Sequence, residues 1–251
     1  MLDRFFVHRS FAMATRSEKY WTGAGLRVGV MRKYAAELLG TFAVVFSGTG
    51  AIVIDSVSGG TVTHAGISLT FGLIVMAMIY AVGGVSGAHF NPAVTVGFLL
   101  ARRLRARWVL PYIGSQLVGA LLASATLRGL FGNVAHLGAT VPAGSAMQSF
   151  LLEVILTALL MFVILSVATG SREQGLMAGI AIGGTVGLEA MFAGPICGAS
   201  MNPARSIAPA LVSGHLTSIW VYIAAPLIGA ALAVPCWFGT RGEFDAENAP
   251  Q

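Results

Sequence analysis

Two short stretches carry the polar side chains best placed to handle a ligand, and they repeat one pattern. Residues 87–95 read Gly-Ala-His-Phe-Asn-Pro-Ala-Val-Thr, and residues 198–206 read Gly-Ala-Ser-Met-Asn-Pro-Ala-Arg-Ser. Neither stretch pairs a nucleophile with a base or gathers metal ligands, so the pattern does not indicate catalysis. Asparagine amides and an arginine are hydrogen-bond donors, and donors suit the transient binding of a neutral molecule through its lone pairs.

Each stretch also predicts the start of a short helix. Asn91 and Asn202 are good N-cap residues, and the prolines that follow occupy the first helical position, where a missing N–H costs nothing. The expected helices, 91–101 and 202–212, are ~16 Å long, about half of the hydrocarbon thickness of a bilayer. We therefore expect two re-entrant segments that meet at the membrane midplane. The two motifs consist of Asn91, Pro92, Ala93, Asn202, Pro203 and Ala204.

The composition of the 251-residue chain indicates an integral membrane protein. Hydrophobic residues make up 56% and charged residues 10% of the chain, and the mean hydropathy is +0.80. Soluble domains carry about a quarter charged residues. The net charge of +5 does not indicate a nucleic-acid partner, because the basic residues concentrate in the first 33 positions and in 102–107. The two cysteines provide neither a disulfide framework nor a metal site, and no cofactor is expected.

Six apolar segments have the length that a bilayer requires. They are 34–54, 65–85, 108–127, 147–168, 176–192 and 218–238. The positions of the basic residues place both termini in the cytoplasm, and short loops without a signal peptide favour a bacterial inner membrane. Each half of the chain has three spans, so the halves have inverted topology. The expected organisation is a cytoplasmic tail (1–33), a channel domain (34–240, with halves 34–129 and 147–240) and a second cytoplasmic tail (241–251).

The centre of this arrangement favours neutral solutes. The stretches 83–90 and 194–201 are rich in Gly and Ala, and we expect them to run extended, with their carbonyls along a pore. The positive ends of both half-helices converge there, so cations and hydrated protons meet an unfavourable field. Arg205 is either a structural arginine tied to loop carbonyls or a donor at the narrowest part of the path. We favour the second role, and the two are compatible.

The doubled Asn-Pro-Ala motif and the six-span inverted repeat resemble the major intrinsic protein family, the aquaporins and aquaglyceroporins, over about residues 32–240. The resemblance implies an all-α membrane fold of six tilted helices and two half-helices, assembled as a homotetramer with one pore in each subunit. It also implies passage of water and small neutral solutes. The run from Phe192 to Ser206, with Tyr222-Ile223, resembles the nodulin-26-like branch and its bacterial relatives, which carries mixed solutes including metalloids.

The same resemblance places the family's selectivity filter on Phe71, Ala190, Ala199 and Arg205. Strict water channels usually carry a histidine where this chain has Ala190, so the two alanines imply a wide opening with one aromatic wall. Such an opening favours glycerol, urea and metalloid hydroxides such as boric or arsenous acid. Ser206 argues for water alone, because glycerol channels typically have an aspartate there. The loop residues expected to line the pore are Gly87, Ala88, His89, Cys197 and Gly198.

Further polar side chains lie in apolar sequence, among them Glu37, Glu153, Glu189 and His89, and the sequence offers no firm role for Glu189. Glu37 and Glu153 occupy matching places in the two halves, and an intramembrane carboxylate by default indicates an ion or proton path. We favour a structural role, because glutamates at such places in the family resemble struts that accept hydrogen bonds from the re-entrant backbone. His89 is either a pH gate or a side chain fixed by loop hydrogen bonds.

The leading interpretation is a passive channel, not an enzyme, that passes water and small uncharged solutes and excludes ions. Its partners are the lipid bilayer and further copies of the same chain. A strict water channel is the first alternative. A coupled transporter is the second, since inverted repeats with broken helices also serve carriers, and a structural protein of membrane junctions is the third.

Overall fold

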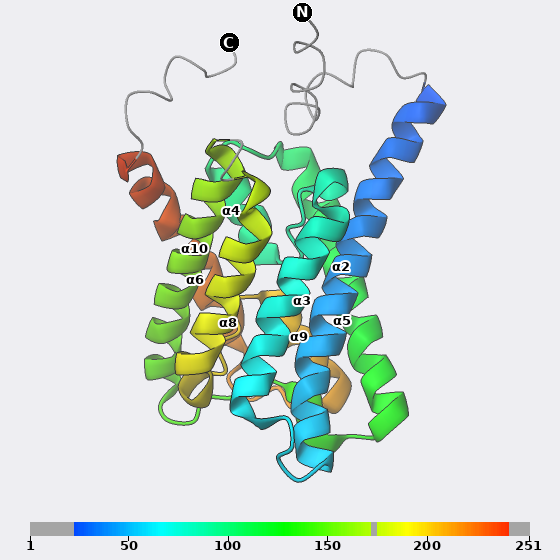
Figure 1. Cartoon of the computed structure of the whole chain (residues 1–251), viewed down its shortest axis with the longest axis vertical. Coiled ribbons are helices and arrows are strands. Elements are labelled where there is room, and N and C mark those ends of the chain that lie inside the picture. Colours follow the sequence, from blue (N-terminus) through cyan, green and yellow to red (C-terminus); the bar gives the residue numbers. More distant parts are fainter. Residues whose placement is uncertain (1–22, 172–174, 241–251) are drawn as a thin grey trace, which may run out of the picture.

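The computed structural model describes residues 23–171 and 175–240 and shows an all-helical bundle (Figure 1). Its long helices are α2 (Gly23–Val57), α3 (Thr63–Ser86), α5 (Val109–Phe131), α6 (Ala146–Thr169), α8 (Ala178–Cys197) and α10 (Ile219–Thr240). The short elements are the helices α4 (Pro92–Leu100) and α9 (Pro203–Ser213) and the 3₁₀ turns η2 (Ala106–Trp108) and η3 (Val134–Gly138). Within the described residues, six helices are long and apolar enough to cross a membrane. The predicted fold class is confirmed.

Apolar side chains cover the outside of the bundle, and polar side chains lie inside it. Leu151 on α6 and Leu188 on α8 are 56% and 66% exposed, which suits contact with lipid tails. Lipid cannot satisfy a polar group, so hydrogen-bonding side chains gather in the interior instead. The fully or almost fully buried polar side chains include Glu37, Thr41, Thr49, Gln116, Glu153 and Glu189.

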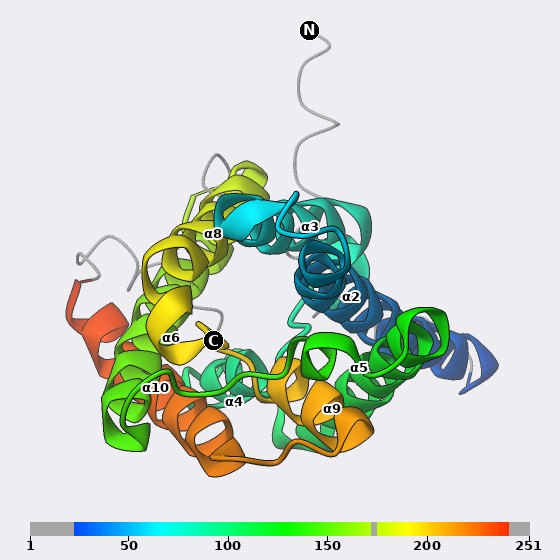
Figure 2. The ribbon, with the colours of Figure 1, turned by 90° about the horizontal axis from the view of Figure 1, so that it is seen from below.

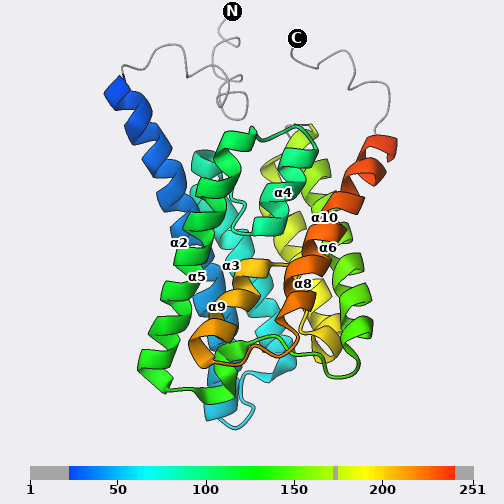
Figure 3. The same ribbon diagram turned by 180° about the vertical axis from the view of Figure 1, so that it is seen from behind.

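The two halves of the chain pack in the same way. Helix α2 packs on α5 in the first half, and α6 packs on α10 in the second. Each short helix packs on the last long helix of the other half, α4 on α10 and α9 on α5. The long helices stand in a ring in Figure 2, and Figure 3 shows α4 and α9 in opposite halves of the bundle's height. The predicted inverted repeat is therefore present, and its halves interlock.

Glycines set the close approach of α3 and α8, which join the two halves. A Cβ atom built on Gly183 would lie 2.5 Å from the carbonyl oxygen of Gly72, and one on Gly72 would lie 2.6 Å from that of Gly183. On α5 and α10, a Cβ at Gly119 or Gly229 would likewise collide with the backbone of the neighbouring helix. Small residues allow membrane helices to pack closely, where van der Waals contact replaces the hydrophobic effect.

We expect Gly183→Ala to destabilise the bundle by about 1–3 kcal/mol, because the added methyl group forces the two helices apart. Gly184→Ala is the matched control, since a Cβ at Gly184 meets no atom within 4 Å. Thermal unfolding of the purified protein in detergent measures the effect. Equal melting temperatures for the two variants would contradict the close crossing.

Helices α3 and α8 run further than predicted. Extended backbone over 83–90 and 194–201 is wrong for the first four residues of each stretch, because α3 continues to Ser86 and α8 to Cys197. Each helix ends at a glycine in the left-handed conformation, Gly87 (φ 90°) or Gly198 (φ 85°), whose N–H bonds to the carbonyl four residues earlier. Extended backbone would leave polar groups without partners at membrane depth, and this cost outweighs the poor helix propensity of glycine.

The expected domain boundaries stay predictions. Helix α2 begins at Gly23, so the last part of the expected tail 1–33 is helical. Residues 1–22 and the expected tail 241–251 lie outside the described residues.

Candidate functional site

Two asparagine side chains start the short helices. The Oδ1 atom of Asn91 accepts a hydrogen bond from the N–H of Ala93 at 2.8 Å. The Oδ1 atom of Asn202 accepts from the N–H groups of Ala204 at 3.0 Å and Arg205 at 3.3 Å. Both asparagines are extended, as an N-cap requires, and a proline follows each one. The caps predicted from the sequence are confirmed.

The nitrogens of the same two side chains tie the halves together. Because each oxygen faces its own helix, each Nδ2 faces the opposite loop: Asn91 donates to the carbonyl of Met201 at 2.7 Å, and Asn202 donates to that of Phe90 at 2.9 Å. Each accepting residue directly precedes the other asparagine. Every amide keeps a second N–H, which is the donor that remains for a passing molecule.

A buried carboxylate holds the loop before α4. The two oxygens of Glu37 accept hydrogen bonds from the N–H groups of His89 at 2.9 Å and Phe90 at 2.8 Å. A third donor, Nε2 of Gln116, approaches at 2.8 Å. Glu153 repeats the arrangement in the second half, accepting from the N–H groups of Ser200 and Met201 at 2.7 and 2.8 Å. These are the bonds that a structural acceptor would make.

Both loops adopt the same strained backbone. Ala88 and Phe90 have φ values of 52° and 50°, and Ala199 and Met201 have φ values of 40° and 52°. A non-glycine residue in the left-handed region costs on the order of 1 kcal/mol or more, so surrounding contacts must hold it there. The paired N–H···carboxylate bonds supply those contacts, which explains the burial of Glu37 in the first half and of Glu153 in the second.

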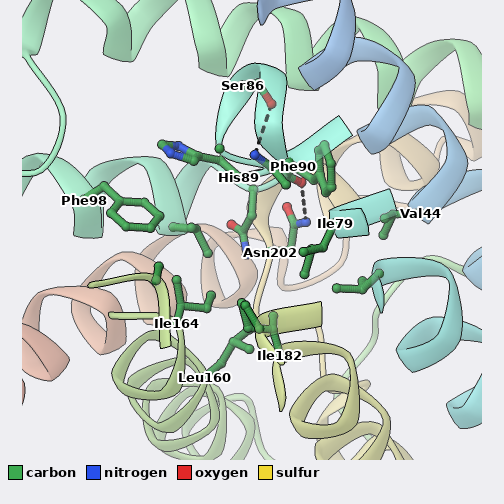
Figure 4. A pocket seen from close by; sticks show the side chains of 18 of the residues that line it. Val44, Ile79, Ser86, His89, Phe90, Phe98, Leu160, Ile164, Ile182 and Asn202 are labelled. Carbon is green, nitrogen blue, oxygen red and sulfur yellow. Dashed lines mark hydrogen bonds between the residues drawn. The ribbon is translucent and has the colours of Figure 1, made fainter. Parts of the chain in front are cut away.

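A cavity of about 1010 Å³ extends from the midplane to the end of the bundle that carries η2. In Figure 4, the apolar side chains of Leu160, Ile164 and Ile182 lie across the cavity from the loop residues His89 and Asn202. A path with one apolar wall and one hydrogen-bonding wall offers a solute few partners and replaces little of an ion's hydration shell.

A second cavity of about 250 Å³ lies at the opposite end, beside η3. Among the described residues, four line both cavities, and they are those assigned to the filter: Phe71, Ala190, Ala199 and Arg205. The structure therefore brings these four side chains together where the two cavities meet.

Arg205 is held on two sides at this junction. One guanidinium nitrogen, Nη1, donates to the carbonyl of Gly138 at 2.8 Å, and Cζ lies 5.0 Å from the centre of the Phe71 ring. The Phe71 ring in turn packs against Gly48, where any Cβ would collide with it. Arg205 is only 3% exposed, yet it lines both cavities. Its position fits both roles considered for it, the structural one and the donor in the path.

The expected loop residues divide into two groups. Those that line a cavity are Gly87, Ala88, His89 and Gly198. The prediction that Cys197 lines the pore is wrong, because its buried Sγ contacts the carbonyl of Ala193, one turn earlier in α8, at 3.5 Å. The reason is the longer helix: Cys197 is the last residue of α8, not part of the loop, and its side chain packs within the bundle.

His89 and Gln116 share one hydrogen-bond partner, the hydroxyl of Thr95, which the sequence does not indicate. The Nδ1 atom of His89 lies 3.0 Å from Oγ1 of Thr95, and Gln116 donates to the same hydroxyl at 3.0 Å. The His89 ring also stacks on Phe98, with 4.6 Å between ring centres. His89 is thus held by its neighbours while it lines the larger cavity. An amide in the otherwise apolar segment 108–127 was the signal that could have identified Gln116.

Ser206 and Glu189 have different surroundings. The Ser206 hydroxyl lies 2.5 Å from that of Ser200 and accepts a hydrogen bond from Thr140 at 2.7 Å, so it joins three hydroxyl groups behind the second loop. Glu189 is 1% exposed, and neither carboxylate oxygen has a hydrogen-bond partner among the described residues. Glu189 lines neither cavity, and nothing in the structure explains it.

An inverted-repeat bundle of membrane spans, with two capped half-helices and two cavities that share four lining residues, is the architecture of a membrane channel. A family model described as major intrinsic protein matches residues 26–237, and the chain belongs to this family of channels. The predicted family is confirmed.

Relatives and a solved structure agree with this assignment. Aquaporin NIP1-1 of Zea mays is 50% identical over 204 residues, which cover 81% of this chain and 72% of that protein. Probable aquaporin NIP4-2 of Arabidopsis thaliana is 53% identical over 205 residues, covering 80% and 72%. These relatives fit the predicted similarity to the nodulin-26-like branch. The X-ray structure of the aquaglyceroporin from Plasmodium falciparum has the same fold, with a TM-score of 0.77 and 24% identity over 88% of this chain and 100% of that chain.

Proposed function

We propose that the chain passes water and small uncharged solutes of about the size of glycerol and excludes protons and other ions. One observation carries the proposal: Ala190 and Ala199 stand with one aromatic ring and one arginine where the two cavities meet. Two methyl groups leave the opening wide, and the arginine supplies hydrogen-bond donors for a hydroxyl or carbonyl oxygen. Urea and metalloid hydroxides such as boric or arsenous acid have the same size and chemistry. The similarity in fold to an aquaglyceroporin supports this range.

Electrostatics supports the exclusion of ions. The positive ends of α4 and α9 meet at the midplane, and Arg205 adds a full charge nearby. No Asp or Glu stands among the described residues that line the two cavities. A coupled transporter would need carboxylates that are free to bind an ion beside the path. Backbone N–H groups already occupy Glu37 and Glu153, and Glu189, whose oxygens have no partner among the described residues, lines neither cavity.

Stopped-flow light scattering on proteoliposomes tests the proposal, by comparing osmotic shrinkage with glycerol and urea uptake. We expect fast water flux together with fast glycerol uptake. Fast water flux without glycerol uptake would favour the strict water channel. Absence of both fluxes would favour the structural role at membrane junctions.

We expect Ala190→His to reduce glycerol uptake by at least about tenfold and to leave most of the water flux, because a larger side chain narrows the opening. Phe192→His is the matched control on the same helix, since Phe192 is 58% exposed and lines neither cavity. The same light-scattering assay measures both variants. Unchanged glycerol uptake in Ala190→His would contradict the assignment of Ala190 to the narrow part of the path.

We also propose that both termini face the cytoplasm and that the channel is a homotetramer. The four arginines of 102–107 lie at one end of the bundle, beside η2, as the positive-inside rule expects of a cytoplasmic face. The tetramer rests on the family resemblance. The relatives named above are plant proteins, so they lend no support to the bacterial inner membrane expected from the sequence.

A further inference from the structure

A histidine at the start of α3 lines the outer cavity in front of the filter. The Nε2 atom of His64 lies 2.7 Å from the carbonyl oxygen of Met191 on α8. A carbonyl oxygen only accepts hydrogen bonds, so Nε2 must carry the proton. In the neutral ring Nδ1 is then an acceptor with a lone pair, and it has no hydrogen-bond partner among the described residues.

The ring is seated against the helix that carries Ala190. A Cβ built on Gly194 would lie 3.0 Å from Cε1 of His64, so the missing side chain at Gly194 leaves the space in which the imidazole packs. Met191 and Gly194 lie within one turn of Ala190 on α8. The His64 ring is therefore fixed close to the filter, although its residue is exposed toward the outer cavity.

The outer cavity combines this acceptor with the donors of Arg205. Nη1 of Arg205 is engaged by Gly138, and Nε has no hydrogen-bond partner among the described residues. Two other polar side chains line the cavity, and both donate their hydroxyl protons elsewhere: Ser68 to the His64 carbonyl and Thr140 to Ser206. A hydroxyl-bearing solute is both donor and acceptor, so it needs both kinds of partner when it sheds water.

We propose that His64 is a further selectivity residue, whose neutral Nδ1 accepts a hydrogen bond from a hydroxyl group of an incoming polyol while Arg205 donates to one of the solute's oxygens. This role rests on the proposed function, because it requires that polyols pass. His64 and Arg205 would together select solutes that both donate and accept hydrogen bonds. The opening at Ala190 and Ala199 would then select among these solutes by size.

The proposed role makes uptake depend on external pH. Histidine is the side chain whose charge can change near physiological pH, and a proton on Nδ1 would turn this atom from an acceptor into a donor. The charged groups around His64 are Arg205, which lines the same cavity from α9, and Asp55 on α2, whose Oδ1 accepts from the N–H of Thr63 at 2.8 Å. From α8 the ring meets the Met191 carbonyl and Gly194. Acidification therefore removes the acceptor and places a second cation in the cavity.

The test measures glycerol and water permeability of cells that express the channel, with the external buffer varied from about pH 8 to about pH 5. We expect glycerol permeability of the wild type to fall about fivefold over this range, the size of one net hydrogen bond. His64→Gln keeps a donor for Met191 and an acceptor for the solute but does not titrate. Its glycerol permeability should therefore equal that of the wild type at about pH 8 and should not change with pH. The glycerol permeability of His64→Leu should not change with pH and should be about fivefold lower than that of His64→Gln at every pH.

Controls separate this role from others. His215→Gln changes a histidine that stacks on His136 at the outer surface and lines neither cavity, and it should keep the wild-type pH dependence. A pH-independent wild type, or a His64→Gln variant that keeps the dependence, would overturn the role of His64 while leaving the proposed function intact. A wild type that passes water but no glycerol at any pH would overturn both.

Discussion

Arg205→Val is expected to make the channel conduct protons and small cations. The substitution removes the one arginine that lines the junction of the two cavities, and it frees the carbonyl of Gly138, which Nη1 of Arg205 now occupies. A unit charge ~4 Å from a permeating cation contributes about 4 kcal/mol at the effective dielectric constant of a protein. The half-helices keep part of the barrier. We therefore expect cation conductance to rise by about 100-fold, less than the full charge alone would give.

Proton flux into proteoliposomes that contain a pH-sensitive dye measures this leak under a potassium diffusion potential. Arg128→Val is the matched control, because Arg128 bonds to the carbonyl of Val212 at the outer surface and lines neither cavity. Arg205→Lys keeps the positive charge, so this variant should still exclude protons and cations. A proton flux in Arg205→Val no greater than in Arg128→Val would rule Arg205 out as the barrier to cations.

Glu37→Leu is expected to prevent stable folding. Its carboxylate accepts three hydrogen bonds, from the N–H groups of His89 and Phe90 and from Nε2 of Gln116. Each buried donor left without a partner costs about 1–3 kcal/mol, so the variant loses roughly 3–9 kcal/mol. That loss is comparable to the whole stability of an ordinary domain. The strained Phe90 backbone also loses the contact that holds it.

The yield and melting temperature of the purified protein measure this effect. Leu39→Ala is a matched control two residues further along α2, where the side chain is 53% exposed on the outside of the bundle. Glu37→Gln retains one accepting oxygen, so its melting temperature should lie between those of Glu37→Leu and Leu39→Ala. If Glu37→Leu melted within a few degrees of Leu39→Ala, the hydrogen bonds of Glu37 would not be what holds the first loop.

Local signals in the sequence predicted the elements and their order. Asn91-Pro92 and Asn202-Pro203 specify helix starts through their own side chains, so the half-helices were predicted to within one residue of their observed starts. The span lengths follow from bilayer thickness, which leaves little freedom. Glu37 and Glu153 stand out in the sequence because a carboxylate in a membrane span is costly unless it has hydrogen-bond partners.

Contacts between distant residues could not be predicted in this way. The hydrogen bond from Arg205 to Gly138 depends on how η3 folds at its end of the bundle. The η3 residues Ala135, His136 and Leu137 have positive φ values, which their residue types do not predict. The filter residues came from the family resemblance, not from spacing alone. The sequence misplaces Cys197 because its glycine-rich surroundings favour extended backbone, whereas backbone at membrane depth must complete its hydrogen bonds, here by continuing α8 to Cys197.

The Asn91 amide bonds to the carbonyl of Met201, and the Asn202 amide bonds to that of Phe90, so each half completes the hydrogen bonds of the other. This dependence has a consequence for the order in which the chain folds during synthesis. The ribosome delivers the first half of the chain before the second. Until the second half follows, the Asn91 amide lacks its acceptor and α4 lacks α10, its packing partner from the other half. A nascent chain that has inserted only its first three spans therefore holds an unfinished loop. The lining of the two cavities is incomplete until the second half, with Asn202 and Arg205, has entered the membrane.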